Sequence, residues 1–275
     1  MMAWHLVRDG GHEVTVVARG ARLVQLQADQ AILDKLHNRA EINVSAALDL
    51  SVPYDLLLVP VKGHQVAEAL HTVQASAART IMFMSVTFRS LSLMRDAVGV
   101  GRFAYGFPKF PAVMKHGILE DTQISSFTPV IVTEACWAKL FKNAHVPSSL
   151  TLDMDSYVRA HIAAATPLLT SCVIVHKRGA GITCAEATSH AKAQAEGFAI
   201  VQQLGHNIPN AGLNWMRHTP LRLNSVVFWL MSRMLPSSFQ ELLQTSAKEA
   251  ADNIDEMSNA APGKTAALLT IRPGT

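Results

Sequence analysis

Two arginines follow directly on a short apolar segment near the start of the chain. The segment "HEVTVVAR" covers residues 12–19; it ends in Arg19, and Arg22 lies three positions later. A guanidinium presents a rigid fork of N–H donors that matches the oxygens of a phosphate or a carboxylate. Arginines at a strand end also commonly face solvent, so the pair by itself leaves both interpretations open.

A second pair of polar residues follows another apolar segment. Residues 53–62 read "PYDLLLVPVK" and end in Lys62, and Gln65 lies three positions further on. A lysine that closes a strand is often simply exposed. The continuous apolar run before Lys62 is typical of a buried parallel strand and favours a functional role for the lysine at its end.

Metal and nucleophile chemistry find less support in the sequence. Cys172 and His176 are four residues apart and could share a helix face, but no CxxC or HExxH pattern accompanies them. There is no GxSxG pattern, and "APGKT" at residues 261–265 lacks the first glycine of a phosphate-binding loop. Scattered histidines and core cysteines explain these residues, so we expect no metal site.

The elements that must position these side chains alternate in the first half of the chain. Short apolar strands are predicted within residues 12–19, 53–62, 79–86 and 125–135, and helices over residues 21–36 and 63–77. After Ser148 the pattern is helical, over residues 154–176, 184–205, 221–235 and 240–261. Strands that alternate with helices indicate a parallel α/β sheet. We expect an α/β domain at residues 1–147 and a helical domain at 148–275.

Composition limits the class of protein. The chain has 275 residues, of which 49% are hydrophobic and 16% charged, and its formal net charge is +3. These values indicate a globular protein, and the charge is too small and dispersed to favour a nucleic acid or a membrane as partner. Three widely spaced cysteines fit a reducing compartment, so we expect a cytoplasmic protein. The apolar run "SVVFWLM" is too short to span a bilayer and is predicted to be one face of a buried helix.

The order of the elements gives the arginines a specific meaning. In a doubly wound nucleotide fold, an arginine at the end of the second strand suits the 2′-phosphate of NADP(H). The glycine-rich turn that would hold the pyrophosphate is missing, because the first residues, "MMAWHLVRDGG", resemble the end of a helix running into this strand. We therefore expect a Rossmann-like parallel sheet lacking its first strand and glycine loop: either the sequence starts late, or that part has been lost.

Taken together, these segments resemble the ketopantoate reductases (2-dehydropantoate 2-reductases). The resemblance rests on "GHEVTVVARGARLVQLQADQ", "YDLLLVPVKGHQVAEAL" and "YGFPKFPAVMKHGIL", and on the helical second half. It implies that Arg19 and Arg22 hold the 2′-phosphate of NADP(H). It also implies that Lys62 and Gln65 line the nicotinamide side of a cleft between the two domains.

The chain departs from the family pattern at the catalytic lysine. The family places this lysine upstream of an "NPLTA"-like turn; the similar turn here is "TPLLT", and a gapless count back puts Val158 at the lysine position. Reduction of a ketone needs a cation or an acid near the carbonyl oxygen. We expect Arg159 or His161 to supply it, His161 because imidazole titrates near neutral pH. A lone histidine on a helix is more often structural.

Two further positions differ from, or only partly follow, the family pattern. The asparagine that the family has after its third strand is absent from "SVTF", where Thr87 could form a weaker hydrogen bond to the cofactor. The late carboxylate that binds the substrate hydroxyl in the family corresponds to Glu256 in "NIDEM". Asp252, Asp255 and Glu256 equally fit a solvated acidic face of a helix.

Two functions of different class follow. The resemblance implies an NADPH-dependent reductase of a small 2-oxo acid, converting 2-dehydropantoate to pantoate as in pantothenate biosynthesis. The alternative is a non-catalytic or truncated family member that keeps the scaffold only. Apolar helices such as the one over residues 221–235 could pack against a second copy, which would give a homodimer.

Overall fold

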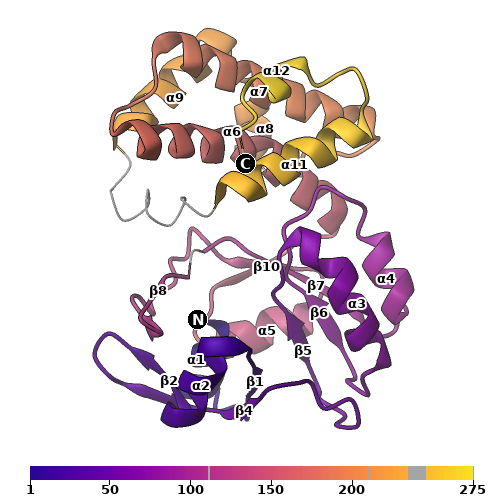
Figure 1. The fold of residues 1–275 in the computed structure, drawn as a ribbon. Coiled ribbons are helices and arrows are strands. Elements are labelled where there is room, and N and C mark those ends of the chain that lie inside the picture. The colour runs from indigo at the N-terminus through magenta and orange to yellow at the C-terminus, as the bar shows by residue number, and fades with distance from the viewer. Residues whose placement is uncertain (111, 210, 235–245, 275) are drawn as a thin grey trace. The chain divides into compact units, whose positions relative to one another are not determined.

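A computed structural model describes residues 1–110, 112–209, 211–234 and 246–274, and its contacts divide the chain into two units (Figure 1). The α/β unit comprises Met1–Ser85 and Ser92–Leu152. The helical unit comprises Asp153–Thr275 together with the loop Val86–Leu91. The sequence placed a boundary after residue 147, whereas the contacts place it after Leu152 and assign an inserted loop of the first half to the helical unit.

A five-stranded sheet forms the centre of the α/β unit. Its order is β11-β10-β7-β6-β5, where β5, β6 and β7 run parallel and β10 is antiparallel to β7. The strands are β5 (Leu57–Val59), β6 (Ile81–Phe83), β7 (Phe103–Pro108), β10 (Val130–Val132) and β11 (Ser148–Leu150). All residues of β6 and β10 are buried, as expected of strands covered on both faces. Strand β11 was missed by the sequence; it pairs in parallel with β10.

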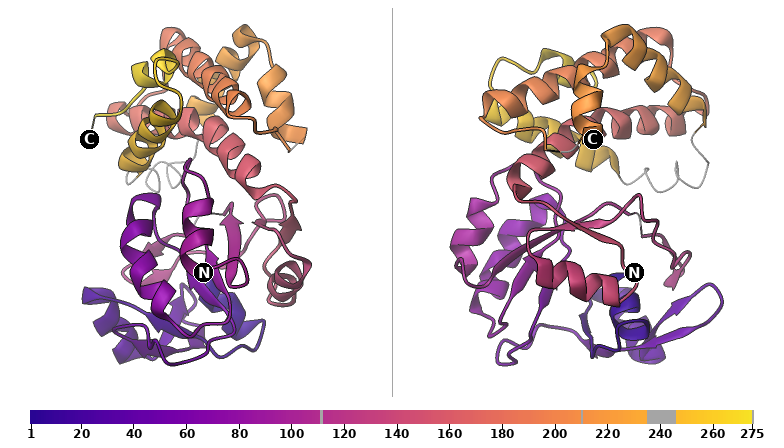
Figure 2. Two further views of the ribbon diagram at one scale, coloured as in Figure 1. Left: turned by 90° about the vertical axis from the view of Figure 1, so that its right-hand side faces the viewer. Right: turned by 180° about the vertical axis from the view of Figure 1, so that it is seen from behind.

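Helices cover both faces of this sheet (Figure 2). Helices α3 (Val66–Ala75) and α4 (Ser92–Val98) contact each other on one side, and the 3₁₀ turn η1 (Gly63–Gln65) leads into α3. Helix α5 (Ala135–Asn143) lies on the other side, where Phe141 joins Met82 and Val130 of the sheet in one hydrophobic cluster. Burial of this apolar area supplies the main stabilisation of the unit.

The predicted strand before Arg19 is present but lies in a separate ladder. It is β1 (Thr15–Val17), which pairs in parallel with β4 (Asn43–Ser45). Helix α1 (Met2–Arg8) precedes β1 and helix α2 (Gly20–Asp29) follows it. Among the described strands, β5 ends the five-stranded sheet, and β1 pairs with β4 alone. The α/β fold with parallel strands is confirmed, and so is the helical segment expected before the first of these strands.

The helix predicted over residues 21–36 is too long. Helix α2 ends at Asp29, and Gln30 adopts a left-handed conformation (φ 48°) that stops it. The residues that follow form β2 (Ala31–Asp34) in a four-stranded sheet of order β3-β2-β9-β8, with β3 (Arg39–Glu41), β8 (Met114–Lys115) and β9 (Ile118–Leu119). Asp34 closes the β2–β3 turn by accepting hydrogen bonds from the backbone N–H groups of Leu36 and Asn38.

The helical unit is built around two long helices, as predicted. Gly197 lets them approach closely, since a Cβ atom at this position would lie 3.1 Å from the Cβ of Ala163. The first six residues of the helix predicted over 240–261 lie outside the described residues. The helices are α6 (Met154–Arg178), α7 (Cys184–Gln203), α8 (Ala211–His218), α9 (Leu221–Met234), α11 (Ser246–Ala260) and α12 (Ala266–Thr270).

Two helices of this unit bear on earlier expectations. Helix α6 is long and apolar enough to cross a membrane by composition, but 72% of its most apolar window is buried in the unit, as in a core helix. Helix α9, expected to be buried, has only a narrow buried face of Asn224, Phe228 and Ser232. A run of its apolar residues is exposed instead: Leu223, Val226, Leu230 and Met234.

Candidate functional site

Arg19 lies where the sequence analysis places it, just beyond the carboxyl end of β1. It is the residue before α2, in an extended conformation (φ −132°, ψ 161°). Its side chain is 86% exposed, and the nearest carboxylate oxygen, from Glu68 of α3, is 3.9 Å from its Nη1. Such a long, exposed ion pair is worth little. The guanidinium therefore stays available to a phosphate.

Arg22 has a different environment from Arg19. Its Nη1 donates hydrogen bonds to the side chain of Gln25 and to the carbonyl of Gly117, both at 2.9 Å. Burial lowers the pKa of the Arg22 guanidinium. Gly117 lies in the β8–β9 turn with φ 80°, a conformation that favours glycine. Arg22 thus ties α2 to this turn, and its Nη1 is already engaged.

Lys62 and Gln65 follow the carboxyl end of β5. The Lys62 backbone N–H donates to the Gln65 side-chain oxygen at 3.1 Å, which closes the η1 turn. Both side chains are exposed. Because β1 and β5 each run parallel to their neighbours, Arg19 and Lys62 both lie beyond carboxyl strand ends, where α/β sheets bind their ligands.

The loop Val86–Leu91, which follows β6, is held by one carboxylate of the helical unit. Oε2 of Glu256, on α11, accepts hydrogen bonds from the Thr87 hydroxyl at 2.9 Å and from the Phe88 N–H at 2.6 Å. Oε1 pairs with Nε of Arg89 at 3.0 Å. The Glu256 side chain is only 9% exposed. Both of its oxygens are therefore engaged by the loop, and the hydroxyl proton of Thr87 is used on Glu256.

Arg159 of α6 lies against the same loop. Its Cζ is 5.1 Å from the centroid of the Phe88 ring, and its Nε is 3.7 Å from Oδ1 of Asp155. Arg159 is 7% exposed, and its Nε has no hydrogen-bond partner among the described residues. Burial lowers the pKa of the guanidinium, and the charge of Asp155 opposes this shift. Asp155 also accepts the Leu91 N–H at 3.3 Å.

His161 lies apart from these groups. It is two residues after Arg159 on α6, which places the two side chains on roughly opposite helix faces. Its ring stacks on that of Tyr157 with centroids 6.4 Å apart. Burial raises the pKa of the Tyr157 hydroxyl to about 12. Of the polar residues predicted on the helical half, the structure brings Arg159 and Glu256 to one loop and leaves His161 outside it.

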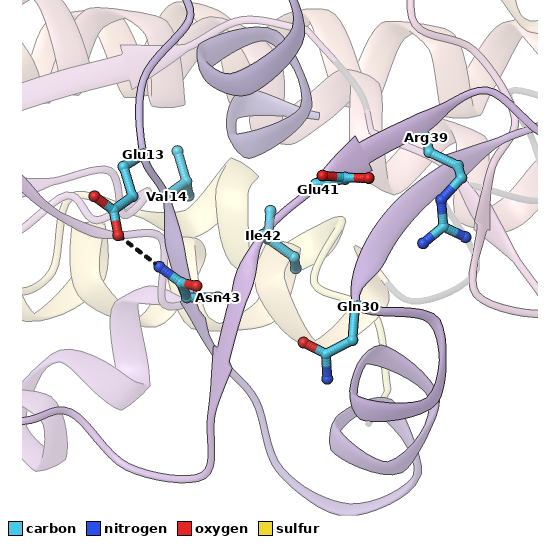
Figure 3. A pocket seen from close by; sticks show the side chains of 7 residues that line it. All are labelled: Glu13, Val14, Gln30, Arg39, Glu41, Ile42 and Asn43. Atoms are coloured by element: carbon cyan, nitrogen blue, oxygen red, sulfur yellow. Dashed lines mark hydrogen bonds between the residues drawn. The ribbon is translucent and has the colours of Figure 1, made fainter.

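A surface hollow lies elsewhere in the α/β unit (Figure 3). Glu13 and Asn43, joined by a hydrogen bond of 2.8 Å, form one side, and Arg39 and Glu41 lie further along it. Glu13 precedes β1 and Asn43 begins β4, so the hollow is at the amino ends of these strands. Arg19 is at their other end. The hollow is therefore separate from the predicted cofactor residues.

No group of three histidine, cysteine, aspartate or glutamate side chains that could hold a metal ion occurs among the described residues. Of the cysteine and histidine weighed as ligands on α6, Cys172 is buried and His176 is exposed. Cys172 is fully buried, and burial raises the pKa of its thiol to about 11.

Comparison with known proteins relates the first part of the chain to a family. Residues 1–118 match the family model "Ketopantoate reductase PanE/ApbA". The match covers 118 of the 275 residues and most of the α/β unit. A search of curated proteins finds no match.

Several solved structures share the fold of nearly the whole chain. One is a PanE/ApbA family ketopantoate reductase from Ralstonia eutropha JMP134, with 14% identity, a TM-score of 0.71, and coverage of 98% of this chain and 93% of that one. D-mandelate dehydrogenase in complex with NADH gives 13% identity, a TM-score of 0.72 and coverage of 98% and 92%. A dimeric ketopantoate reductase from Staphylococcus aureus gives 10% identity, a TM-score of 0.58, and coverage of 94% of this chain and 97% of that one. At these identities the likeness establishes the fold.

The family model ends at residue 118, and helix α6 lies beyond it. Val158, at the position predicted for the family lysine, is 1% exposed and lies in the core. Sequence reasoning identified Thr87, Arg159 and Glu256 but missed Asp155 and Arg89, which complete the same cluster. Asp155 precedes Arg159 by one helical turn, a spacing typical of an ion pair, and this signal was available. No sequence signal connects Arg89 with Glu256.

Proposed function

We propose that this chain is an NADPH-dependent reductase of a small 2-oxo acid, with 2-dehydropantoate as its first candidate substrate. The observation that carries the proposal is the family match over residues 1–118 together with the exposed Arg19 at the carboxyl end of β1. The reaction consumes a proton and a hydride and yields a 2-hydroxy acid, so the chain must bind an anionic substrate and a dinucleotide.

The residues at the carboxyl strand ends fit a phosphorylated dinucleotide. Arg19 would bind the 2′-phosphate through charge-assisted hydrogen bonds, since Glu68 at 3.9 Å competes weakly. Lys62 and Gln65 would lie along the nicotinamide, and the backbone of the loop at Thr87 would contact it. When bound, the cofactor supplies the hydride; the protein supplies binding and orientation. Arg22, held at Gly117, would contribute to the phosphate site by fixing the start of α2.

The helical unit would supply the polar groups around the substrate. Arg159 is fixed between Phe88 and Asp155, and its positive charge would favour the negative charge that develops on a carbonyl oxygen. His161 is the second candidate for this role. The resemblance assigns Glu256 to a substrate hydroxyl. Because its oxygens already accept hydrogen bonds from the loop Val86–Leu91, Glu256 would instead position this loop beside the substrate.

The test is oxidation of NADPH by the purified chain with a panel of branched 2-oxo acids, followed by cofactor titration. We expect NADPH to bind more tightly than NADH, and Arg19→Ala to remove most of that preference, about ten- to hundredfold for a lost charge-assisted contact. Arg79→Ala is the matched control, because Arg79 is 70% exposed and pairs with Asp55 away from these strand ends. Equal affinity of the unaltered chain for both cofactors would exclude this role for Arg19.

The buried Val158 supports a second candidate, a non-catalytic family member that binds a dinucleotide without turnover. NADPH binding with no oxidation against the whole panel would favour it. For both candidates we propose a cytoplasmic protein, supported by three free cysteines among the described residues, Cys136, Cys172 and Cys184.

We further propose that the chain forms a homodimer. The support is the exposed apolar run on α9, which is unusual for an isolated surface helix. A twofold contact places the same surface on both copies, so one helix face is sufficient to build it.

A further inference from the structure

The loop Val86–Leu91 belongs to the α/β half by sequence and to the helical unit by contact. It begins three residues after β6 ends. Glu256 accepts hydrogen bonds from Thr87 and Phe88, and Asp155 accepts one from Leu91. The Thr87 hydroxyl also accepts the Arg89 N–H at 3.2 Å. These bonds fix the backbone on both sides of Arg89, which is the exposed cation of the loop.

The side chain of Arg89 is anchored at one atom. Its Nε pairs with Oε1 of Glu256 at 3.0 Å, while the side chain as a whole is 65% exposed. Glu256 is itself immobilised by burial and by the hydrogen bonds that it accepts from Thr87 and Phe88. Within the described residues, the terminal nitrogens of Arg89 have no hydrogen bond. Anchoring at Nε leaves the end of the fork, with its two terminal nitrogens, for a planar acceptor.

Arg159, the other cation beside this loop, is less able to bind a ligand. It is 7% exposed and packs on the Phe88 ring. The charges of Arg89, Arg159, Glu256 and Asp155 sum to zero. Recognition of an anion here would therefore depend on the fixed donors of one guanidinium rather than on a net positive field.

We propose that Arg89 binds the carboxylate of an acidic substrate end-on through its two terminal nitrogens, with Glu256 as the positioning residue that orients it. A carboxylate beside a carbonyl, as in a 2-oxo acid, is the chemical class that fits, because the loop follows the carboxyl end of a parallel strand. This inference rests on the proposed function. It assigns substrate binding to a residue for which the resemblance gives no role.

The experiment compares binding of 2-oxo-3-methylbutanoate with that of its uncharged amide, by calorimetric titration of the full chain saturated with NADP⁺. We expect the unaltered chain to prefer the acid. Arg89→Ala should weaken binding of the acid about ten- to hundredfold and leave binding of the amide unchanged. Glu256→Gln should reduce the preference for the acid by a smaller factor and increase hydrogen exchange of the loop amides. Arg222→Ala, an exposed arginine of α9, is the control.

Each outcome decides the inference. It is overturned if Arg89→Ala retains the preference for the acid, if the unaltered chain shows no preference, or if Arg222→Ala loses it equally. Equal acid preference in Glu256→Gln and the unaltered chain overturns the positioning role. If acid binding depends on Arg89 but NADPH is not oxidised, the inference stands and the proposed reductase falls. If NADPH is oxidised and Arg89→Ala leaves KM unchanged, the reductase stands and the inference falls.

Discussion

Arg19 and Arg22 are three residues apart, yet their surroundings separate their roles. Arg19 is exposed with a distant partner, whereas Arg22 donates to Gly117 and Gln25. We expect Arg22→Ala to lower the free energy of unfolding by about 1–2 kcal/mol, the usual value of a partly buried charged hydrogen bond. The preference for NADPH over NADH should remain. Thermal unfolding of this variant measures the stability, and cofactor titration measures the preference for NADPH. A variant with unchanged stability that has lost this preference would show that Arg22 binds the phosphate directly.

The residue scale also shows where prediction from the sequence ends. The position of Arg19 could be predicted, because strand direction determines which end of β1 it follows. Glu256 could be assigned only through a resemblance, and its partners could not be found, since Thr87 and Phe88 are 169 and 168 positions away. Contacts of this length depend on the packing of α11 against α6, which a single sequence does not specify.

At the scale of elements, helical apolar spacing and continuous apolar runs were predictable, and strands that lack a continuous apolar run, such as the six-residue β7, were not. Helices α6 and α7 and the strands β5 and β6 follow from apolar spacing and continuous apolar runs. Strand β2 was mistaken for the end of a helix, because its four residues are strand-forming only beside β3 and β9. Gln30, which ends α2, adopts a left-handed conformation that is uncommon for glutamine and that its residue type does not predict.

The start of α7 gives a prediction with a definite pH dependence. Thr183 and Glu186 form a capping box, and Arg178 pairs with Glu186. The hydrogen bond from Arg178, followed by that from Thr183, lowers the pKa of Glu186 from 4.5 to about 2. A carboxyl whose pKa is lowered by folding stabilises the protein above its unfolded pKa, and this contribution is lost as pH falls through the folded pKa.

Glu186→Gln should therefore lower the free energy of unfolding by about 1 kcal/mol near neutral pH, through loss of the charged pair with Arg178, because glutamine keeps an oxygen that can accept the Thr183 N–H. The difference in the free energy of unfolding between the variant and the unaltered chain should decrease as pH falls from 4.5 towards 2. Urea unfolding at several pH values measures it. Asp252→Asn is the control, since Asp252 lies on another helix, α11, where it forms an i,i+4 pair with Lys248. A difference that is constant with pH would show that the Glu186 charge contributes nothing.

At the scale of the whole molecule, the exposed face of α9 is the feature that folding of one chain leaves unexplained. Leu223, Val226, Leu230 and Met234 recur at intervals of three and four residues, which places them along one helix face. They are 50%, 51%, 45% and 78% exposed. Covering such a face with a second copy would remove apolar area from water, which stabilises the contact by about 25 cal/mol for each Å² buried.

If this face joins two copies, charge placed on it should separate them without unfolding the chain. We expect Leu223→Glu with Leu230→Glu to convert a dimer to a monomer in light scattering after gel filtration, with unchanged helix content by circular dichroism, because a dimer contact would bury all four carboxylates, two from each copy. Leu269→Glu is the matched control: Leu269 on α12 is 51% exposed and lies off this face. A dimer that survives the double substitution, or an unaltered chain that is monomeric at micromolar concentration, would contradict the assignment of α9.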